Sequence, residues 1–382
     1  MVPERTGHGS LMRVVRIIGV LEPGGAQLSA LRLSRALTAL GIDASLLLSG
    51  DATEAGIDVA RRYGAEIETF SLGEHRRLQW TPDEVFVDWL RPRLVGADLV
   101  HAHMFGAWWA AAAALEGTDT PLVASEHNAL SWPHGDHSAA AKAAARRVTA
   151  FFAHGPAARA FAATLGLDPR SVHEGRSAVE GLHASPLPDL ATPRLTFTGR
   201  FREDKGPDVL LEALPLLARE VDELPHCYLV GDGPLREWLV RRTHELGLAD
   251  RVRFTGWNYG PARYVAGAAV HVVPSREEAW SQSAVVAMGL GVPVVGTAVE
   301  GLPLTLGESR GLLVAPEDPQ ALAAGIASVL RGEVHTDLAG GREYAARFEA
   351  GPVAEQYASV YRRAIHDHHH DHHHHLSRGG DR

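Results

Sequence analysis

The chain has 382 residues, too many for one ordinary hydrophobic core, and 45% of them are hydrophobic, which excludes a disordered protein. Its formal net charge of -9 opposes wholesale binding to nucleic acid or to an anionic membrane, because both favour a basic surface. Cys227 is the single cysteine and excludes an internal disulfide. No apolar run approaches the ~20 residues that span a bilayer, and the first residues lack the apolar core of a signal peptide. We therefore expect a soluble, cytoplasmic protein with no nucleic-acid partner and no stable membrane insertion.

The first half of the chain alternates predicted strands and helices. Residues 13–20 (RVVRIIGV) form an apolar run, Gly24 and Gly25 follow it, and a helix with apolar residues at helical spacing extends to Gly41. Further short strands are predicted at 44–49, 67–70, 98–100, 122–124 and 149–153. Apolar strands that alternate with helices predict a parallel sheet covered on both faces.

A proline-rich break divides the chain. Residues 183–193 (HASPLPDLATP) favour extended backbone, so we predict a linker there between domains at 1–182 and 194–348. The alternation restarts with strands at 195–198, 226–230, 252–254, 270–273 and 292–295 and helices near 207–219, 235–247 and 281–290. The fold class is α/β, and the cleft between two such domains is the natural ligand site. Histidines dominate residues 366–382, which we expect to be a disordered tail and not a metal site.

A basic segment joins a strand to a helix in the second domain. In residues 199–206 (GRFREDKG), Arg200 and Lys205 follow the strand, and Pro207 suits the first turn of the next helix. Two cations beside a helix N-terminus form a site for a diphosphate. The alternative is a solvated loop whose charges bind nothing.

Residues 274–283 (PSREEAWSQS) also follow a strand and open a helix. Backbone N–H groups near Trp280, Ser281 and Gln282 can hold phosphate or sugar hydroxyls at such a helix start. Glu277 or Glu278 can accept hydrogen bonds from sugar hydroxyls. Alternatively, both carboxylates only stabilise the helix dipole.

Glycines at two other strand ends give weaker signals. Gly24 and Gly25 allow the backbone to approach a ligand closely, but they do not form the G-x-G-x-x-G fingerprint of a nicotinamide site. Gly231, in the segment GDGP, is interpreted either as a ligand contact or as a turn alone.

Histidines follow several predicted strands of the first half, at 101, 103 and 127. His127 can hydrogen-bond a substrate or stabilise charge, although an isolated histidine is more often structural. Neither a zinc-type spacing nor an acidic D-x-D pair is present in the sequence. We therefore expect cations and helix dipoles to neutralise the phosphates, with no metal and no other cofactor.

Together these segments resemble the retaining glycosyltransferase family 4, whose GT-B fold has two Rossmann-like domains facing across a cleft. The resemblance rests on the Gly-Gly after the first strand, GRFREDKG, LVGDGPLRE, RVRFTG and PSREEAW…AMGLGVPVV, in this order, up to about residue 361. It implies sugar transfer from a nucleotide diphosphate sugar, first a UDP-sugar, to a small acceptor with retention of configuration. It also implies that a last helix, at 349–365, packs back on the first domain.

The resemblance also implies roles for the site residues, all toward the donor. The phosphates would contact Arg200, Lys205, Gly24 and Gly25, the base would be held by backbone around Trp257, and the sugar would contact Glu278 and His127. One position departs from the family pattern: the second glutamate of its E-x7-E motif is Val286, which cannot accept a hydrogen bond from the ribose. Ser281 also stands where the motif usually has glycine.

The segment EEAWSQSAVVAMGLGVPVVGTAVEGLPLTLGE is similar to glycosyltransferases of aminoglycoside antibiotic biosynthesis. This implies a 2-deoxystreptamine-containing pseudodisaccharide as acceptor, and the negative net charge suits such a polycation. The main alternative is a catalytically degenerate GT-B subunit that binds a nucleotide and activates a partner, which Val286 favours. A sugar-nucleotide epimerase and a Rossmann dehydrogenase are further alternatives, the latter disfavoured by the missing dinucleotide fingerprint.

Overall fold

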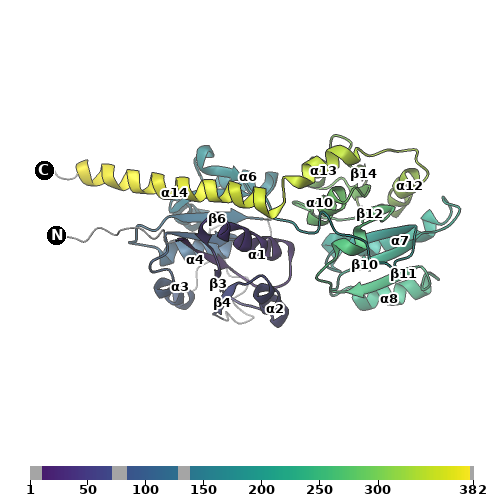
Figure 1. Ribbon diagram of the computed structural model, residues 1–382, viewed down its shortest axis with the longest axis horizontal. Helices are drawn as coiled ribbons and strands as arrows, with labels where there is room; N and C mark the ends of the chain where they lie inside the picture. The colour runs from purple at the N-terminus through teal and green to yellow at the C-terminus, as the bar shows by residue number, and fades with distance from the viewer. Residues whose placement is uncertain (1–10, 71–83, 128–137, 379–382) are drawn as a thin grey trace. The chain divides into compact units, whose positions relative to one another are not determined.

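The computed structural model describes residues 11–70, 84–127 and 138–378, which divide into two compact units (Figure 1). The first unit comprises Met1–Ala178 and Ala350–Arg382, and the second comprises Val179–Glu349. The segment predicted as a linker is part of the second unit. Within it, the Leu187 N–H donates to the Arg263 carbonyl at 3.3 Å and the Ala191 N–H donates to the Tyr228 hydroxyl at 3.1 Å.

The first unit is built on a parallel sheet. Its strands follow the order β4-β3-β1-β5-β6-β7-β8, and β2 pairs with β1. Their bounds are β1 Met12–Ile18, β2 Ile42–Asp43, β3 Leu46–Ser49, β4 Glu66–Thr69, β5 Leu99–His103, β6 Leu122–Glu126, β7 Val148–Ala153 and β8 Val172–Glu174. The register places Arg16 of β1 beside His101 of β5, and His103 beside Ser125 of β6.

Helices cover both faces of this sheet, as continuous apolar strands require. One face packs against α1 (Gly25–Thr38) and α14 (Ala350–Arg378). The other contacts α3 (Glu84–Leu90), α4 (Phe105–Ala114), α5 (Ser138–Ala145) and α6 (Pro156–Thr164). The remaining elements are α2 (Glu54–Arg62), η2 (Arg91–Arg93) and η4 (Pro169–Ser171).

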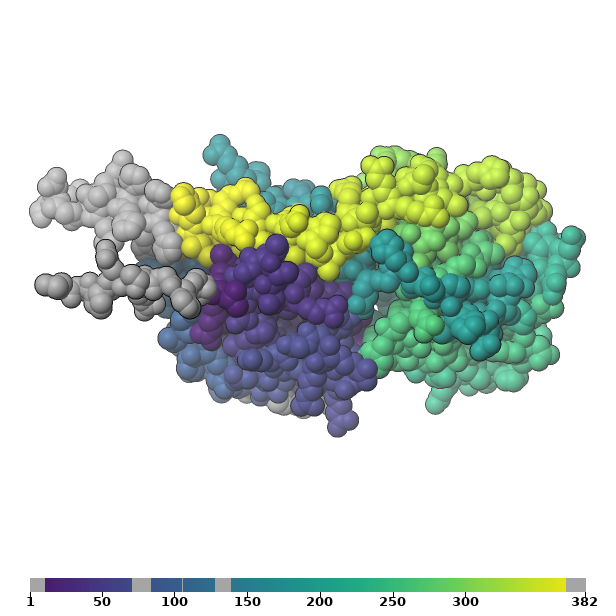
Figure 2. Space-filling model, in the orientation of Figure 1, coloured from purple at the N-terminus to yellow at the C-terminus, as the bar shows by residue number. Residues whose placement is uncertain are grey.

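Helix α14 returns the chain to the first unit and lies along α1, as the yellow ribbon of Figure 1 and the yellow surface of Figure 2 show. Its buried side chains recur at helical spacing, with Val353, Tyr357, Val360, Tyr361 and Ala364 facing the sheet. The helix continues to Arg378, so the prediction of a disordered tail from 366 is wrong over most of that range. No glycine or proline interrupts the chain between 353 and 378, so the packed turns propagate into the histidine tract.

The second unit holds a six-stranded parallel sheet in the order β11-β10-β9-β12-β13-β14. Its strands are β9 Arg194–Thr198, β10 His226–Val230, β11 Val252–Gly256, β12 Val270–Val273, β13 Val294–Thr297 and β14 Leu312–Val314. One face packs against α7 (Pro207–Leu217), α8 (Arg236–Glu245) and α12 (Pro319–Leu330). The other packs against α10 (Gln282–Gly289), α11 (Leu302–Leu306) and α13 (Leu338–Ala346), with α9 (Ala262–Val265) and η5 (Glu203–Lys205) completing the unit.

Both units therefore have the helix-covered parallel sheet that the alternation predicts. Strand β13 begins two residues later than the predicted 292–295. The predicted strand at 44–49 corresponds to β3, which begins at Leu46, and β2 lies just before the predicted range. Within the described residues, no helix is both long enough and apolar enough to cross a membrane.

Candidate functional site

The order of strands in the second unit singles out one position on its sheet. From β9 the chain builds outward through β10 to β11, and then returns to the other side of β9 to form β12. Loops after β9 and β12 therefore diverge at the carboxyl edge, and open α/β sheets bind ligands at such switch points. The two loops are residues 199–206 and 274–281, the segments that the sequence singles out.

A cation and a carboxylate meet at this switch point. The Lys205 ammonium lies 3.0 Å from Oε2 of Glu278 and 3.4 Å from the carbonyl oxygen of Glu277. The Ser275 hydroxyl donates to the same Glu278 oxygen at 3.3 Å. The Lys205 and Glu278 side chains are 23% and 12% exposed, so each is held by the protein and still reaches solvent. Such a pair can offer a positive charge to phosphate and acceptor oxygens to hydroxyl groups.

The two loops are tied to each other by Arg276. Its guanidinium forms a bidentate pair with Asp208 at 2.9 and 2.7 Å, and its backbone N–H donates to the Asp204 carbonyl at 2.9 Å. The Asp208 pair, with a further ion pair to Glu317, raises the pKa of Arg276 above its ordinary value. Fixed cross-links of this kind position Lys205 against Glu278 before any ligand arrives.

Gly206 allows the closest approach of the two loops. It has a φ of +64°, and a Cβ at this position would lie 1.9 Å from the carbonyl oxygen of Pro274. Any side chain would push the start of α7 away from the loop after β12. Pro207 then begins α7 at its first turn, as the sequence predicts.

Gly231 brings a third loop into the same edge. Its Cβ would lie 1.9 Å from the carbonyl oxygen of Gly199, and its N–H donates to the Gly256 carbonyl at 3.1 Å. The structure thus gives Gly231 a packing role that joins the loops after β9, β10 and β11. Trp257 follows β11 directly and is 39% exposed.

The start of α10 contains the other predicted residues of this loop. Ser281 is the N-cap, and its hydroxyl accepts from the Ala284 N–H at 3.3 Å, so part of the helix start is already satisfied. Gln282 opens the helix, and Trp280 packs on Phe348 with ring centroids 4.7 Å apart. Val286 is half-buried against apolar neighbours. Arg200 lies in the loop after β9 and is half-buried.

The remaining predicted residues lie in the first unit. Gly24 is the N-cap of α1 after β1, and Gly25 is the first residue of that helix. His127 directly follows β6 and is partly exposed. These residues and the Lys205–Glu278 pair thus come from different units of the chain.

His127 belongs to a row of imidazoles at the carboxyl edge of the first sheet. Its ring stacks on His154, which follows β7, with centroids 3.8 Å apart, and lies 5.9 Å from His103 at the end of β5. Burial, and then the positive charge of Arg16, lowers the pKa of His127 to about 4. Burial also holds the pKa values of His103 and His154 well below the ordinary value. The row is therefore uncharged at neutral pH.

Hydrogen bonds from the buried Arg16 side chain help to position the row. Arg16 is fully buried, and its guanidinium donates to the Ala30 carbonyl, the Ser34 hydroxyl and, at 3.0 Å, to Nε2 of His103. His103 accepts that bond and so carries its proton on Nδ1, which has no hydrogen-bond partner within the described ranges. His127 Nε2 likewise lacks one there. Two buried ring nitrogens of the row thus have no hydrogen-bond partner among the described residues.

Sequence reasoning missed Arg16 and His154. Arg16 sits inside an apolar run and gives no signal of function. His154 follows its strand in the same way as His127, so the shared position after consecutive strands is a signal that could have identified it.

The comparisons with known proteins match both units. Residues 23–174 match the family described as Glycosyltransferase Family 4, and residues 192–332 match that described as Glycosyl transferases group 1. The lipopolysaccharide core biosynthesis glycosyltransferase LpsD of Rhizobium meliloti is 34% identical over 46% of this chain and 52% of its own length. The D-inositol 3-phosphate glycosyltransferase of Saccharomonospora viridis is 35% identical over 45% and 43%. The chain thus spans about half the length of the curated relatives it matches.

Solved structures agree in fold. Anabaena HepE in complex with UDP superposes with a TM-score of 0.75 over 92% of this chain and 100% of that one, at 20% identity. Sucrose-phosphate synthase of Thermosynechococcus elongatus superposes with a TM-score of 0.72 over 93% of this chain and 99% of that one, at 22% identity. Two Rossmann-like units with these neighbours establish the GT-B fold that the sequence predicts.

Proposed function

We propose that this chain, whose two units match glycosyltransferase family models and have the GT-B fold, is a glycosyltransferase. In this proposal it transfers a sugar from a UDP-sugar to a small acceptor with retention of configuration. The observation that carries this proposal is the Lys205–Glu278 pair at the switch point of the second sheet. HepE, a structural neighbour, has been solved with UDP and with UDP-glucose, which makes a uridine donor the first candidate.

In this proposal the donor diphosphate binds beside Lys205 and Arg200. Lys205 already contacts Glu278, so it can bridge that carboxylate to a phosphate oxygen without rearranging. As the bond between sugar and diphosphate breaks, negative charge grows on the diphosphate, and a fixed ammonium stabilises it more than in the ground state. Neither a metal nor another cofactor is part of the proposal.

Glu278 is proposed to hold the donor sugar. Oε2 accepts from Lys205 and from Ser275, which fixes the carboxylate and leaves Oε1 for sugar hydroxyls. The proposed roles of Trp257, Trp280, Ser281, Gln282 and Gly231 are to line the nucleotide side of the same edge. His127 and the Gly24–Gly25 turn are proposed to contact the donor from the first unit.

The proposed acceptor is a cyclitol-containing molecule, specifically a 2-deoxystreptamine-containing pseudodisaccharide. The sequence resemblance and the net charge of -9 support a cationic acceptor. Several relatives are named for D-inositol 3-phosphate, which is itself a cyclitol. An anionic inositol phosphate and a polycationic aminocyclitol therefore make a direct pair of competing acceptors.

The test is turnover by the purified chain. UDP-glucose and UDP-N-acetylglucosamine are each supplied with either acceptor, and the glycosylated product is identified by mass spectrometry and its anomer by NMR. Product with the aminocyclitol acceptor and retained configuration supports the full proposal. Product with the inositol phosphate alone overturns the acceptor, and an inverted anomer overturns the stereochemistry.

Val286 favours a second candidate, a degenerate subunit that binds a nucleotide and activates a partner. Its side chain packs against apolar residues and offers no hydrogen-bond acceptor to a ribose. UDP binding without turnover for any donor and acceptor pair favours this candidate. Turnover by the pure chain excludes it.

A further inference from the structure

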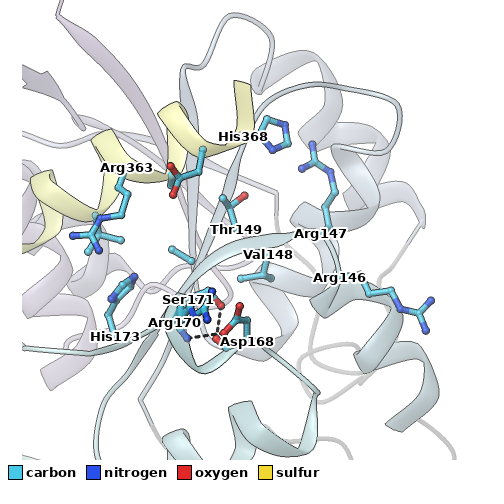
Figure 3. A pocket seen from close by; sticks show the side chains of 14 residues that line it. Arg146, Arg147, Val148, Thr149, Asp168, Arg170, Ser171, His173, Arg363 and His368 are labelled. Atoms are coloured by element: carbon cyan, nitrogen blue, oxygen red, sulfur yellow. Dashed lines mark hydrogen bonds between the residues drawn. The ribbon is translucent and has the colours of Figure 1, made fainter. Parts of the chain in front are cut away.

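A cavity of about 460 Å³ lies in the first unit, on the edge of the sheet away from the imidazole row. Figure 3 shows its lining, which comes from the start of β7, from η4 and β8, and from the far part of α14. His154 follows the other end of β7, and six strand residues at ~3.3 Å each put the two positions roughly 20 Å apart. The volume falls in the range of small-molecule pockets, about 300–1,000 Å³.

The lining is basic in a protein that is acidic as a whole. Four arginines and two aspartates contribute four positive and two negative charges, hence +2 with the imidazoles neutral, against -9 for the chain. Both carboxylates have partners next to them in the sequence. Asp168 accepts the Arg170 N–H at 2.9 Å, and Asp367 lies 3.2 Å from the His366 ring. Neither aspartate forms an ion pair with the lining arginines in the part of the chain described.

The four arginines differ in how they are held. Arg147 is engaged, because its guanidinium donates to the Thr118 and Thr120 carbonyls at 2.8 Å each. Arg146 points away from the other lining side chains in Figure 3. The guanidinium groups of Arg170 and Arg363 have neither a hydrogen bond nor an ion pair to any described residue, although both line the cavity. These two arginines are therefore available to an anion.

The pKa of His173 indicates a positive electrostatic potential inside the cavity. Figure 3 shows its ring beneath the guanidinium of Arg363. Burial lowers the pKa of His173, and the positive charges of Arg363 and Arg159 lower it further. The imidazole is therefore neutral and can donate one N–H, while the surrounding charge favours an anion. Ser171 lies on the same wall, where its hydroxyl donates to the Asp168 carbonyl at 2.8 Å.

We propose that this cavity binds the phosphoryl group of a ligand other than the sugar donor, with Arg170 and Arg363 as its cationic anchors and His173 as a hydrogen-bond donor. Guanidinium groups match phosphoryl oxygens in charge and in planar geometry. The ligand is either a soluble phosphorylated molecule or the headgroup of an anionic lipid, which share this chemistry. The inference does not depend on the proposed sugar transfer.

Calorimetric titration with inorganic phosphate tests the site, in Lys205→Ala protein so that the donor site does not contribute. The same protein is compared with added Arg170→Gln and Arg363→Gln, and with Arg251→Gln as the matched control, since Arg251 is an arginine of the second unit paired with Glu223. We expect saturable binding that weakens at least tenfold in the Arg170 and Arg363 variants, remains unchanged in the Arg251 variant, and weakens with added salt. Equal affinity in all variants, or no saturation, overturns the site for free phosphate.

A second arm separates the two ligand sources. The chain is sedimented with phosphatidylglycerol vesicles and with phosphatidylcholine vesicles, with and without Arg170→Gln and Arg363→Gln. Binding to phosphatidylglycerol that needs both arginines assigns the site to a lipid headgroup, whereas arginine-dependent phosphate binding without sedimentation assigns it to a soluble ligand. Absence of arginine-dependent binding in both arms overturns the proposal. When Lys205 is retained, the Arg170→Gln and Arg363→Gln variants should bind UDP with normal affinity. Loss of the phosphoryl site can therefore be distinguished from loss of the donor site.

Discussion

Lys205 and Glu278 come from loops 73 residues apart in sequence and form one unit in the structure. The ammonium is held by a carboxylate, a carbonyl and the nearby Asp204 carboxylate at 3.8 Å. The residue types in 199–206 and 274–283 could be identified from the sequence, because charged residues directly follow predicted strands. Their pairing could not, because it depends on β12 returning beside β9, which no local pattern records.

Substitution of Lys205 tests the phosphate role. Lys205→Ala removes the ammonium from the leaving diphosphate, so we expect sugar transfer to fall by about two orders of magnitude or more, the scale for loss of a transition-state donor. The measurement is kcat/KM for the donor. Arg251→Ala is the control, since that arginine pairs with Glu223 away from the switch point, and its activity stays normal. Near-normal turnover in Lys205→Ala contradicts the assignment.

Glu278→Gln separates the sugar from the nucleotide. The amide still accepts a hydrogen bond from Lys205 but loses the charge that holds sugar hydroxyls. Hydrogen bonds to charged groups contribute about 1.5–3 kcal/mol, so transfer should fall roughly 10- to 150-fold while UDP affinity changes little. Calorimetry with UDP beside steady-state kinetics makes the comparison. Full activity, or parallel loss of UDP binding, argues against a contact confined to the sugar.

At the scale of elements, the site depends on how closely the strand-to-helix loops approach one another. The sequence predicts the strand, loop and helix at 194–217 correctly, since the apolar strand, the charged loop and Pro207 are local signals. It does not predict the contact of Gly206 with Pro274, or of Gly231 with Gly199, because these join separate loops. The prediction of disorder for the histidine tract of α14 is wrong for a similar reason. The helix there extends from turns that pack on a sheet distant in sequence, which no local pattern records.

Gly206→Ala tests this loop contact against a matched control. Gly206 and Gly247 both have positive φ, at +64° and +69°, but a Cβ at Gly247 has nothing within 4 Å. In both variants the free energy of unfolding should fall by about 1 kcal/mol, because alanine disfavours the left-handed backbone conformation. The free energy of unfolding measured with urea should fall further in Gly206→Ala, because its loops must separate. For the same reason this variant should bind UDP at least tenfold more weakly. Equal losses in the two variants, with normal UDP binding, would show that the contact does not position the site.

At the scale of the whole molecule, buried imidazoles link stability to pH. His101, His103 and His154 in the first unit and His271 in the second are buried, and burial lowers the pKa of each, that of His271 to about 3. The unfolded chain then binds more protons than the folded one below the ordinary pKa of about 6.5. The contribution of these neutral histidines to the free energy of unfolding is therefore fully present above that pH and is lost as the pH falls below it.

The prediction is a urea midpoint that is flat above pH 7 and declines steadily from pH 6.5 to pH 5. Each fully buried histidine contributes up to about 1.4 kcal/mol per pH unit across that window. The window lies above the ordinary range of the carboxylates, so their titration does not obscure the slope. His271→Asn should make the decline shallower in the second unit. A midpoint independent of pH between 7 and 5 contradicts neutral burial of these rings.

The whole-molecule architecture was largely accessible from sequence. Two runs of alternating strands and helices on either side of a proline-rich segment predict two α/β units, and the structure has both. The division itself falls at 178 and 350, since packing decides it, and residues 179–193 bond to the second unit. The imidazole row was only partly accessible, because its members follow separate strands and depend on Arg16, which is hidden in an apolar run.

Direct titration of UDP into the purified chain tests the central claim, that the loops after β9 and β12 form a nucleoside diphosphate site. Isothermal calorimetry is performed on the wild type, Lys205→Ala and Arg251→Ala, with NAD as the comparison ligand. The account predicts saturable UDP binding that weakens at least tenfold in Lys205→Ala, is unchanged in Arg251→Ala, and is absent for NAD. UDP affinity that is equal in wild type and Lys205→Ala, or binding of NAD in its place, would contradict it.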